Sequence, residues 1–123
     1  MRVVPGVLLA LYVGTMPTFA QDQVRACLLS GPQYQLASDT VEWRMVVGRG
    51  QGCVRGIRAT LTTLDSVSLA VPPQAGRIKL EGPGFLYQAD SEFRGEDSFT
   101  MIVSGKLSNI PGSSTIRVLV SVR

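Results

Sequence analysis

The chain has 123 residues, of which 45% are hydrophobic and 17% are charged, and its formal net charge is +3 at pH 7. This charge is too small to predict nucleic-acid binding, and the length suits one domain with its own hydrophobic core. The sequence contains no histidine, which excludes Ser-His and Cys-His nucleophiles and histidine-ligated metals. We therefore predict a protein without enzymatic activity, cofactor or metal site.

The first 20 residues, MRVVPGVLLALYVGTMPTFA, have the pattern of a cleaved signal peptide. Arg2 supplies a basic start, residues 3–13 form an apolar stretch, and Thr18 and Ala20 suit a signal peptidase. The apolar stretch is too short for a permanent transmembrane helix. We expect an exported protein, periplasmic or extracellular, with a single mature domain at residues 21–123 and no stable membrane insertion.

The two cysteines, Cys27 and Cys53, predict one disulfide, because exported chains mature in an oxidising compartment. Two thiols without histidine cannot form the usual four-ligand zinc site, and their spacing is not the Cys-x-x-Cys spacing of a redox pair. In the chain-entropy view, closing this loop stabilises the fold by about 3 kcal/mol.

Short runs in which apolar and polar residues alternate follow one another along the mature chain, as expected of half-buried β-strands. In chain order they cover residues 40–47, 57–61, 67–71, 78–80, 85–87, 99–104 and 116–122. The segments GRGQG, VPPQAG, EGPG, FRGED and NIPGSS separate these runs and have the glycine and proline chemistry of turns. No window of helical length has an apolar stripe. About seven short strands in a chain of this length predict an all-β sandwich.

The basic segment GRGQGCVRGIR, residues 48–58, permits two interpretations. Arg49, Arg55 and Arg58 could form an anion-binding or partner-binding loop, because glycines leave backbone amides accessible. Alternatively, the segment is a glycine-rich hairpin with solvated arginines. We favour the hairpin, because the Lys-Ser/Thr pair of a phosphate-binding loop is absent. Trp43, just before this segment, is predicted to pack in the core against the disulfide.

The segment FRGEDSF, residues 93–99, places acidic side chains and a glycine between two phenylalanines. Its acids lack the dense Asp/Asn-Gly spacing of a calcium loop, and a sandwich of this size has little room for the cleft of a glycosidase. We predict a structural corner instead, with Phe93 and Phe99 entering the core. In that corner Gly95 adopts a backbone conformation that other residues resist, and Asp97 hydrogen-bonds turn amides.

The second half of the chain carries a wider pattern around this corner. It has a Pro-x-x-Gly turn, an aromatic step, the motif F-x-G-x-D-x-F and a final strand of alternating valines. The matching positions are Pro73, Gly76, Tyr87, Phe93, Gly95, Asp97 and Phe99. Over residues 73–122 the chain therefore resembles the bacterial Ig-like (cadherin-like) domain of exported proteins, which implies an antiparallel Ig-like sandwich and a role in binding or cell adhesion.

This sequence departs from the family pattern in two respects. Such domains usually occur as tandem repeats, and this chain has one. The family often follows its motif with a tyrosine and a trailing aspartate, where this chain has Met101 and the pair Ser104-Gly105. An acid at that place would serve as a calcium ligand, so its absence weakens the calcium interpretation.

Two functions from different classes remain. The first is a non-catalytic module that binds a protein or a glycan of the cell envelope or the exterior through strand edges or loops. The second is a structural component that associates weakly with copies of itself, head to tail. That alternative rests on the arginines gathered in residues 44–58 and the acids gathered in residues 81–97.

Overall fold

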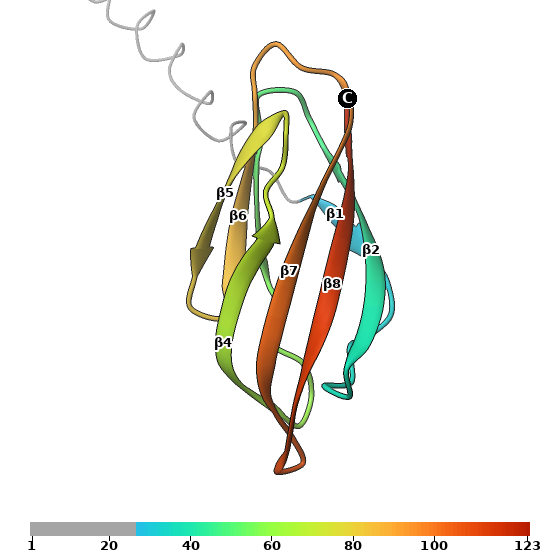
Figure 1. Cartoon of the computed structure of the whole chain (residues 1–123). Coiled ribbons are helices and arrows are strands. Elements are labelled where there is room, and N and C mark those ends of the chain that lie inside the picture. The colour runs from blue at the N-terminus through green and yellow to red at the C-terminus, as the bar shows by residue number, and fades with distance from the viewer. Residues whose placement is uncertain (1–26) are drawn as a thin grey trace, which may run out of the picture.

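The computed structural model describes residues 27–123, which form two β-sheets packed face to face (Figure 1). The predicted signal peptide at residues 1–20 lies outside this range. The described residues contain strands and connections only, so none of them belongs to a helix that could cross a membrane. The eight strands are β1 (Leu28–Ser30), β2 (Asp39–Val47), β3 (Gly52–Gly56), β4 (Thr62–Val71), β5 (Gly76–Glu81), β6 (Gly84–Ala89), β7 (Gly95–Leu107) and β8 (Ile110–Val122).

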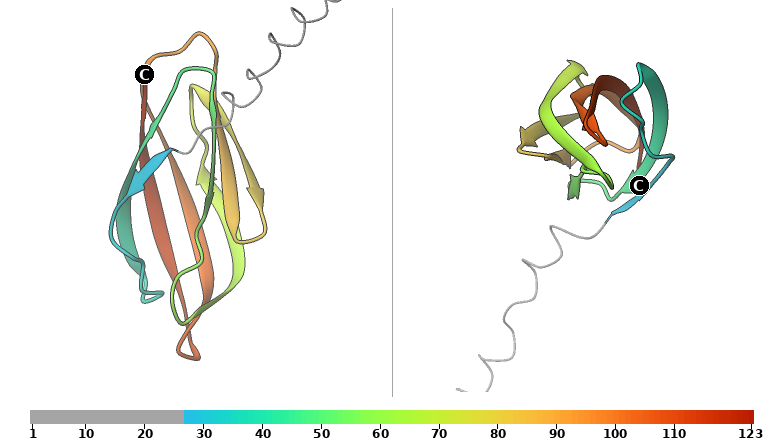
Figure 2. Two further views of the ribbon diagram at one scale, coloured as in Figure 1. Left: turned by 180° about the vertical axis from the view of Figure 1, so that it is seen from behind. Right: turned by 90° about the horizontal axis from the view of Figure 1, so that it is seen from below.

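The two sheets differ in size. One has five strands in the order β1-β2-β8-β7-β4, and the other has three in the order β3-β6-β5. The end-on view in Figure 2 shows the two layers curving around a common core. The prediction of an all-β sandwich is thus confirmed.

The expectation of a wholly antiparallel sandwich of about seven strands needs correction. Residues 27–123 contain eight strands, and β2 runs parallel to β8, with Val41 opposite Ile116 and Val47 opposite Val122. A parallel pair needs a long connection between its strands. Here the five intervening strands, β3 to β7, and their turns supply it, because β2 and β8 lie near opposite ends of the described chain.

The alternating pattern works as predicted along the long strands. On β2, β7 and β8 every second side chain points into the core, and β6 covers the core from the other sheet. Phe99 of β7 lies at the centre, edge-on to Phe85 at 5.4 Å between ring centroids and stacked on Tyr87 at 5.9 Å. Burying aromatic rings of this size supplies a large share of the hydrophobic stabilisation. Trp43 is also buried, and its indole N–H donates to the Pro32 carbonyl oxygen at 2.8 Å.

The strand predicted at residues 57–61 is wrong, and its alternation has another cause. The strand of this region is β3, which starts earlier, at Gly52, inside the segment 48–58 predicted to be a hairpin. That hairpin is wrong as well, because β3 pairs with β6 of the smaller sheet and not with β2. Ile57 is buried because it lies under the segment that closes one end of the sandwich, where the Tyr34 hydroxyl donates to the Ile57 carbonyl oxygen at 2.6 Å. A residue that is buried by a crossing segment can therefore produce the same alternation of apolar and polar residues as a short strand.

The turn predicted at NIPGSS is also displaced. Strand β8 begins at Ile110 and so runs through most of this segment, and it meets β7 in a two-residue turn, Ser108-Asn109, whose φ angles are 49° and 70°. Two positive φ angles are typical of the type I′ turn that matches the twist of hairpin strands. Pro111 is tolerated within β8 because β2 pairs with β8 only from Ser114 onward, so no ladder hydrogen bond is lost there.

Candidate functional site

The FRGEDSF corner is built around the carboxylate of Asp97, which is 8% exposed. One carboxylate oxygen accepts from the backbone N–H of Gln74 at 2.8 Å and from that of Ser98 at 2.9 Å. The other accepts from the N–H of Ala75 at 3.0 Å and from the Tyr87 hydroxyl at 2.8 Å. Asp97 of β7 therefore ties the connection between β4 and β5 to β6.

The hydrogen bonds of this network determine the protonation states of the Asp97 carboxyl and the Tyr87 hydroxyl. Burial acts to raise the pKa of Asp97, but hydrogen bonds from Gln74, Tyr87, Ser98 and Ala75 outweigh it and hold the pKa below its usual value. Burial, followed by the hydrogen bond to the Asp97 carboxylate, raises the pKa of Tyr87 well above its usual value. Asp97 is thus an ionised acceptor, and Tyr87 is a permanent donor.

The other motif residues lie around the same network. Gly95 has a φ of 134°, which disfavours any side chain. A Cβ on Gly76 would lie 2.6 Å from the Tyr87 hydroxyl oxygen, so only glycine fits there. Phe99 is fully buried, whereas Phe93 is half-buried at the border of the core. These positions describe a structural corner, and no group of three or more acids, cysteines or histidines among the described residues could hold a metal ion.

A second carboxylate network, which the sequence analysis missed, lies at the other end of the sheet. Asp39 accepts from the N–H groups of Gln35 at 2.9 Å and Ala37 at 3.1 Å, and the Ser114 hydroxyl donates to it at 2.6 Å. Burial acts to raise the pKa of Asp39, but the hydrogen bonds from Ser114, Ala37 and Gln35 lower it to about 2. A short polar residue at the start of a strand is the signal that could have indicated this Asx-type turn.

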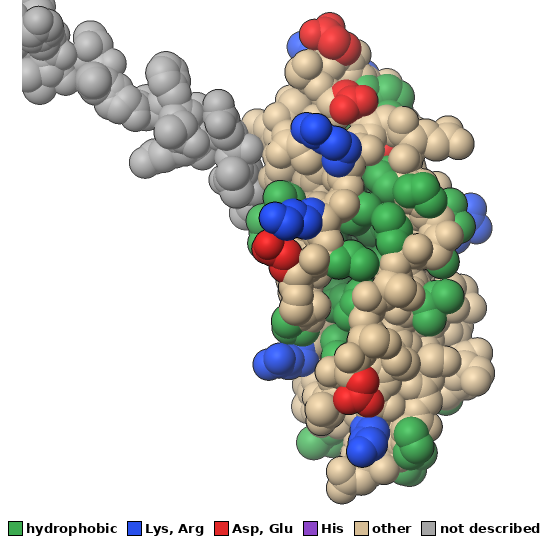
Figure 3. Space-filling view, turned by 60° about the vertical axis from the view of Figure 1, so that its left-hand side comes forward, with side chains coloured by type: hydrophobic (Ala, Val, Ile, Leu, Met, Phe, Trp, Pro, Cys, Tyr) green, Lys and Arg blue, Asp and Glu red, His purple; other side chains and the backbone are tan. Residues whose placement is uncertain are grey.

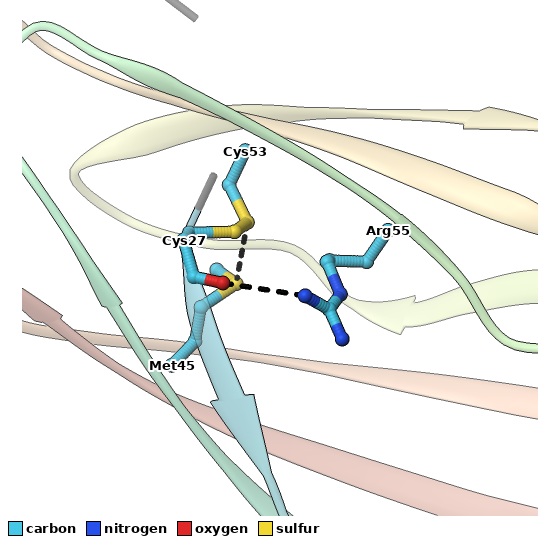
Figure 4. The surroundings of a disulfide bond; sticks show 4 residues. All are labelled: Cys27, Met45, Cys53 and Arg55. Atoms are coloured by element: carbon cyan, nitrogen blue, oxygen red, sulfur yellow. Dashed lines mark hydrogen bonds between the residues drawn. A yellow bond between two sulfur atoms is a disulfide. The ribbon is translucent and has the colours of Figure 1, made fainter. Parts of the chain in front are cut away.

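The predicted disulfide is present and joins the two sheets along one side. Cys27 precedes β1 of the larger sheet and Cys53 lies on β3 of the smaller one, with a Cα–Cα distance of 5.7 Å. The Met45 sulfur lies 3.5 Å from the Cys53 sulfur, and Arg55 donates to the Cys27 carbonyl oxygen at 3.3 Å (Figure 4). This side of the sandwich is therefore clamped covalently.

The three arginines of the basic segment do not come together. Arg49 lies in the β2–β3 loop at one end, where its backbone N–H donates to the Arg123 carbonyl oxygen at 2.8 Å. Arg55 points toward Cys27, as described above. Arg58 is exposed beyond the end of β3. Their placement in three different surroundings gives no shared anion site.

The side opposite the disulfide is open. There β4 and β5, edge strands of different sheets, lie next to each other (Figures 1 and 3). We define the open side by its half-buried apolar side chains, which are Leu64, Val67 and Leu69 of β4 and Ile78 and Leu80 of β5. Figure 3 shows a band of apolar side chains along the middle of this face.

A cleft of about 260 Å³ lies at one end of the open side. Leu64 and Val67 form its β4 wall, the β5–β6 turn residues Gly82 and Pro83 form the opposite wall, and Arg58 lies at its border. The cleft is too small for a drug-sized ligand but suits one or two side chains of a partner.

Aromatic side chains are buried throughout the described part of the chain. Five of them, Tyr34, Trp43, Phe85, Tyr87 and Phe99, belong to the core, and Phe93 is half-buried. The surface that the structure describes therefore has no aromatic platform on which a sugar ring could stack.

No protein-family model matches this chain, and no curated protein matches its sequence.

Proposed function

We propose that this chain is an exported, non-catalytic Ig-like interaction module that binds a protein along its open side. Strand order supports the Ig-like part of the proposal. In such sandwiches, strands B, E and D share one sheet, and C, F and G share the other. If β3 to β8 are taken as B to G, the orders β3-β6-β5 and β4-β7-β8 correspond to this arrangement. The F-x-G-x-D-x-F motif then lies at the start of strand F.

The observation that supports the binding proposal is that the apolar side chains of the open side lie between the free edges of β4 and β5. Strand β4 is ten residues long and pairs only with β7, so backbone donors and acceptors on its other edge have no partner strand in the described chain. An extended segment of a partner protein can hydrogen-bond to the free edge of β4 and bury its own side chains against the apolar side chains of the open side. A glycan is less well suited, because no described aromatic ring is fully exposed.

The edges also carry features that make such binding selective. Asp65 and Ala70 are extra residues in β4 relative to β7, and each produces a bulge in the strand. On β5 the exposed side chains are Arg77, Lys79 and Glu81, and Lys79 pairs with Glu81 at 3.3 Å. Bulges and edge charges oppose indiscriminate pairing between sheets. A partner must therefore fit the bulged edge, and a flat strand of another copy does not.

The charge distribution does not favour the alternative of head-to-tail assembly. Arg44 lies on the outer face of β2 and pairs with Glu42 at 3.3 Å. Arg49 lies at the end of the molecule that also carries the acidic β6–β7 connection, since a Cβ on the adjacent Gly50 would be 3.5 Å from the Ser91 Cα. Basic and acidic segments thus lie side by side within one copy.

Site-specific photo-crosslinking tests the proposal. A benzophenone amino acid is placed at Ala70, an exposed residue of the β4 edge, and in a control protein at Thr40, an exposed residue of β2. After irradiation of the exporting cells, we expect a discrete heavier adduct with a second protein from the Ala70 position alone. Equal adducts from both positions, or an adduct from Thr40 alone, would contradict binding at the open side.

A further inference from the structure

A different surface, at the end of the sandwich away from the C-terminus, carries exposed aliphatic side chains. Leu61 is 73% exposed and Ile110 is 68% exposed. They lie close together, because Ser108 donates its N–H to the Leu61 carbonyl oxygen at 3.0 Å and Ile110 is opposite Leu107 in the hairpin. We call Leu61, Leu107 and Ile110 the apolar tip. In Figure 1 the β7–β8 hairpin that bears it projects beyond the other strands at the lower end.

The backbone holds the apolar tip in an exposed position. Leu61 has a φ of 61°, a conformation that is unfavourable for leucine and persists only where its surroundings hold it. The Thr62 hydroxyl donates to the Ala59 carbonyl oxygen at 2.6 Å on one side, and Ser108 bonds Leu61 on the other. The exposure of these side chains is therefore built into the fold.

Basic side chains flank the apolar tip. Lys106 precedes Leu107 on β7, and Arg58 lies in the neighbouring β3–β4 connection, both exposed and neither in an ion pair with a described residue. The exposed acids of this end are Asp65 and Glu81, and Glu81 pairs with Lys79 at 3.3 Å, while Asp39 is occupied by three hydrogen bonds. Figure 3 shows apolar side chains at the lower end with a basic side chain between them and an acidic side chain just above it.

We propose that the apolar tip inserts into the interfacial region of a lipid bilayer, with Arg58 and Lys106 at the level of the headgroups. The tip is convex and aliphatic, whereas protein hot spots favour Trp, Tyr and Arg, and leucine is under-represented there. Anionic headgroups complement the two free basic side chains. Transfer of one exposed aliphatic side chain into an apolar environment strengthens binding about tenfold or more. Two such side chains give reversible attachment, as weak anchors do.

Vesicle sedimentation with the disulfide-bonded mature chain tests this inference. One vesicle preparation contains phosphatidylcholine alone, and the other also contains phosphatidylglycerol. The tip variant combines Leu61→Ser and Ile110→Ser. The control variant combines Leu28→Ser and Val54→Ser, whose side chains are 73% and 62% exposed elsewhere. We expect the tip variant to reduce the partition coefficient by at least tenfold on both vesicles and the control variant to leave it unchanged.

A variant without the two basic side chains separates the electrostatic contribution to vesicle binding from the apolar one. Arg58→Gln with Lys106→Gln should weaken binding severalfold on the anionic vesicles only, and added salt should abolish that difference. Melting curves of all variants establish that they fold. Absence of parent binding to either vesicle, or equal losses in the tip and control variants, would overturn the inference. Neither result bears on the open side, which lies on other strands.

Discussion

At the scale of single residues, two ionised aspartates determine how the connections lie on the sheets. Asp97 holds the β4–β5 connection through the N–H groups of Gln74 and Ala75, and Asp39 holds the β1–β2 connection through those of Gln35 and Ala37. In both cases the acceptor lies on a long strand and the donors lie in a connection. Each carboxylate replaces the backbone partner that an irregular segment lacks.

Replacement of Asp97 by alanine should lower the free energy of unfolding by about 1–3 kcal/mol, because buried donors lose their acceptor. Urea unfolding at neutral pH measures this loss. The matched control is Glu96→Ala, which removes an exposed neighbouring acid and should change stability by less than about 0.5 kcal/mol. Equal losses in both variants, or a calcium-dependent melting temperature in the parent, would contradict the structural role.

The stability that depends on Asp39 should vary with pH in one direction. Its pKa in the folded state is about 2, below the ordinary value of 3.8, so the unfolded chain takes up the proton first as the pH falls. The contribution is therefore complete above pH 4 and is lost between about pH 4 and pH 2. Chemical unfolding of the parent and of Asp39→Asn, compared at pH 7 and pH 2.5, should show a difference that shrinks at the lower pH. A constant difference would exclude this linkage.

At the scale of elements, a disulfide anchors one side of the sandwich and a tight turn closes its projecting end. Strand β3 has five residues with glycine at both ends, and Cys53 within it is tied to Cys27 beside β1. A strand this short contributes few ladder hydrogen bonds, so the covalent link supplies part of its anchorage. At the projecting end, the β7–β8 hairpin depends on turn geometry instead.

Removal of the disulfide by Cys27→Ser with Cys53→Ser should cost about 2–4 kcal/mol, because the unfolded chain regains the freedom of the loop between the two cysteines. Thermal unfolding with and without reductant measures it. The parent should lose stability on reduction, and the double variant should be insensitive to reductant. Two thiols that react with an alkylating agent in oxidised, native protein would contradict the bridge.

The Ser108-Asn109 turn offers a stabilising change. Glycine is the favoured second residue of a type I′ turn, and Asn109 has a φ of 70°. Asn109→Gly should therefore raise the free energy of unfolding by up to about 1 kcal/mol, within the range of favourable turn replacements. Asn109→Val is the control and should lower it, since a β-branched residue resists a positive φ. The opposite order of melting temperatures would exclude the type I′ geometry.

At the scale of the whole molecule, the protein is a sandwich with one clamped side and one open side. Strands β7 and β8 have neighbours on both edges, whereas β5 and β4 each have one free edge. Amide hydrogen exchange should therefore be slowest in β7 and β8 and fastest among the strands in β5, because edge strands open at lower cost. Uniform protection across all strands would contradict this ranking. The open side thus combines free hydrogen-bonding groups with apolar surface.

Local residue patterns by themselves determined the all-β class, the buried faces of the long strands and the pairing of the two cysteines. This was possible because side-chain direction alternates with period two within a strand, and because a chain with two cysteines allows only one intramolecular pairing. The same rule failed at Ile57, which is buried by a crossing segment, and at NIPGSS, where pairing with β7 extends through a proline.

Only the tertiary structure decided the parallel pairing of β2 with β8, the Asp39–Ser114 contact, the separation of the three arginines and the positions of the open side and the apolar tip. Each of these joins or separates segments that are far apart in the chain. Ser114, for example, donates to a residue 75 positions away. Such contacts depend on which strands become neighbours when the core packs. Neither the alternation of residues within a strand nor the residue types of a turn specifies those neighbours.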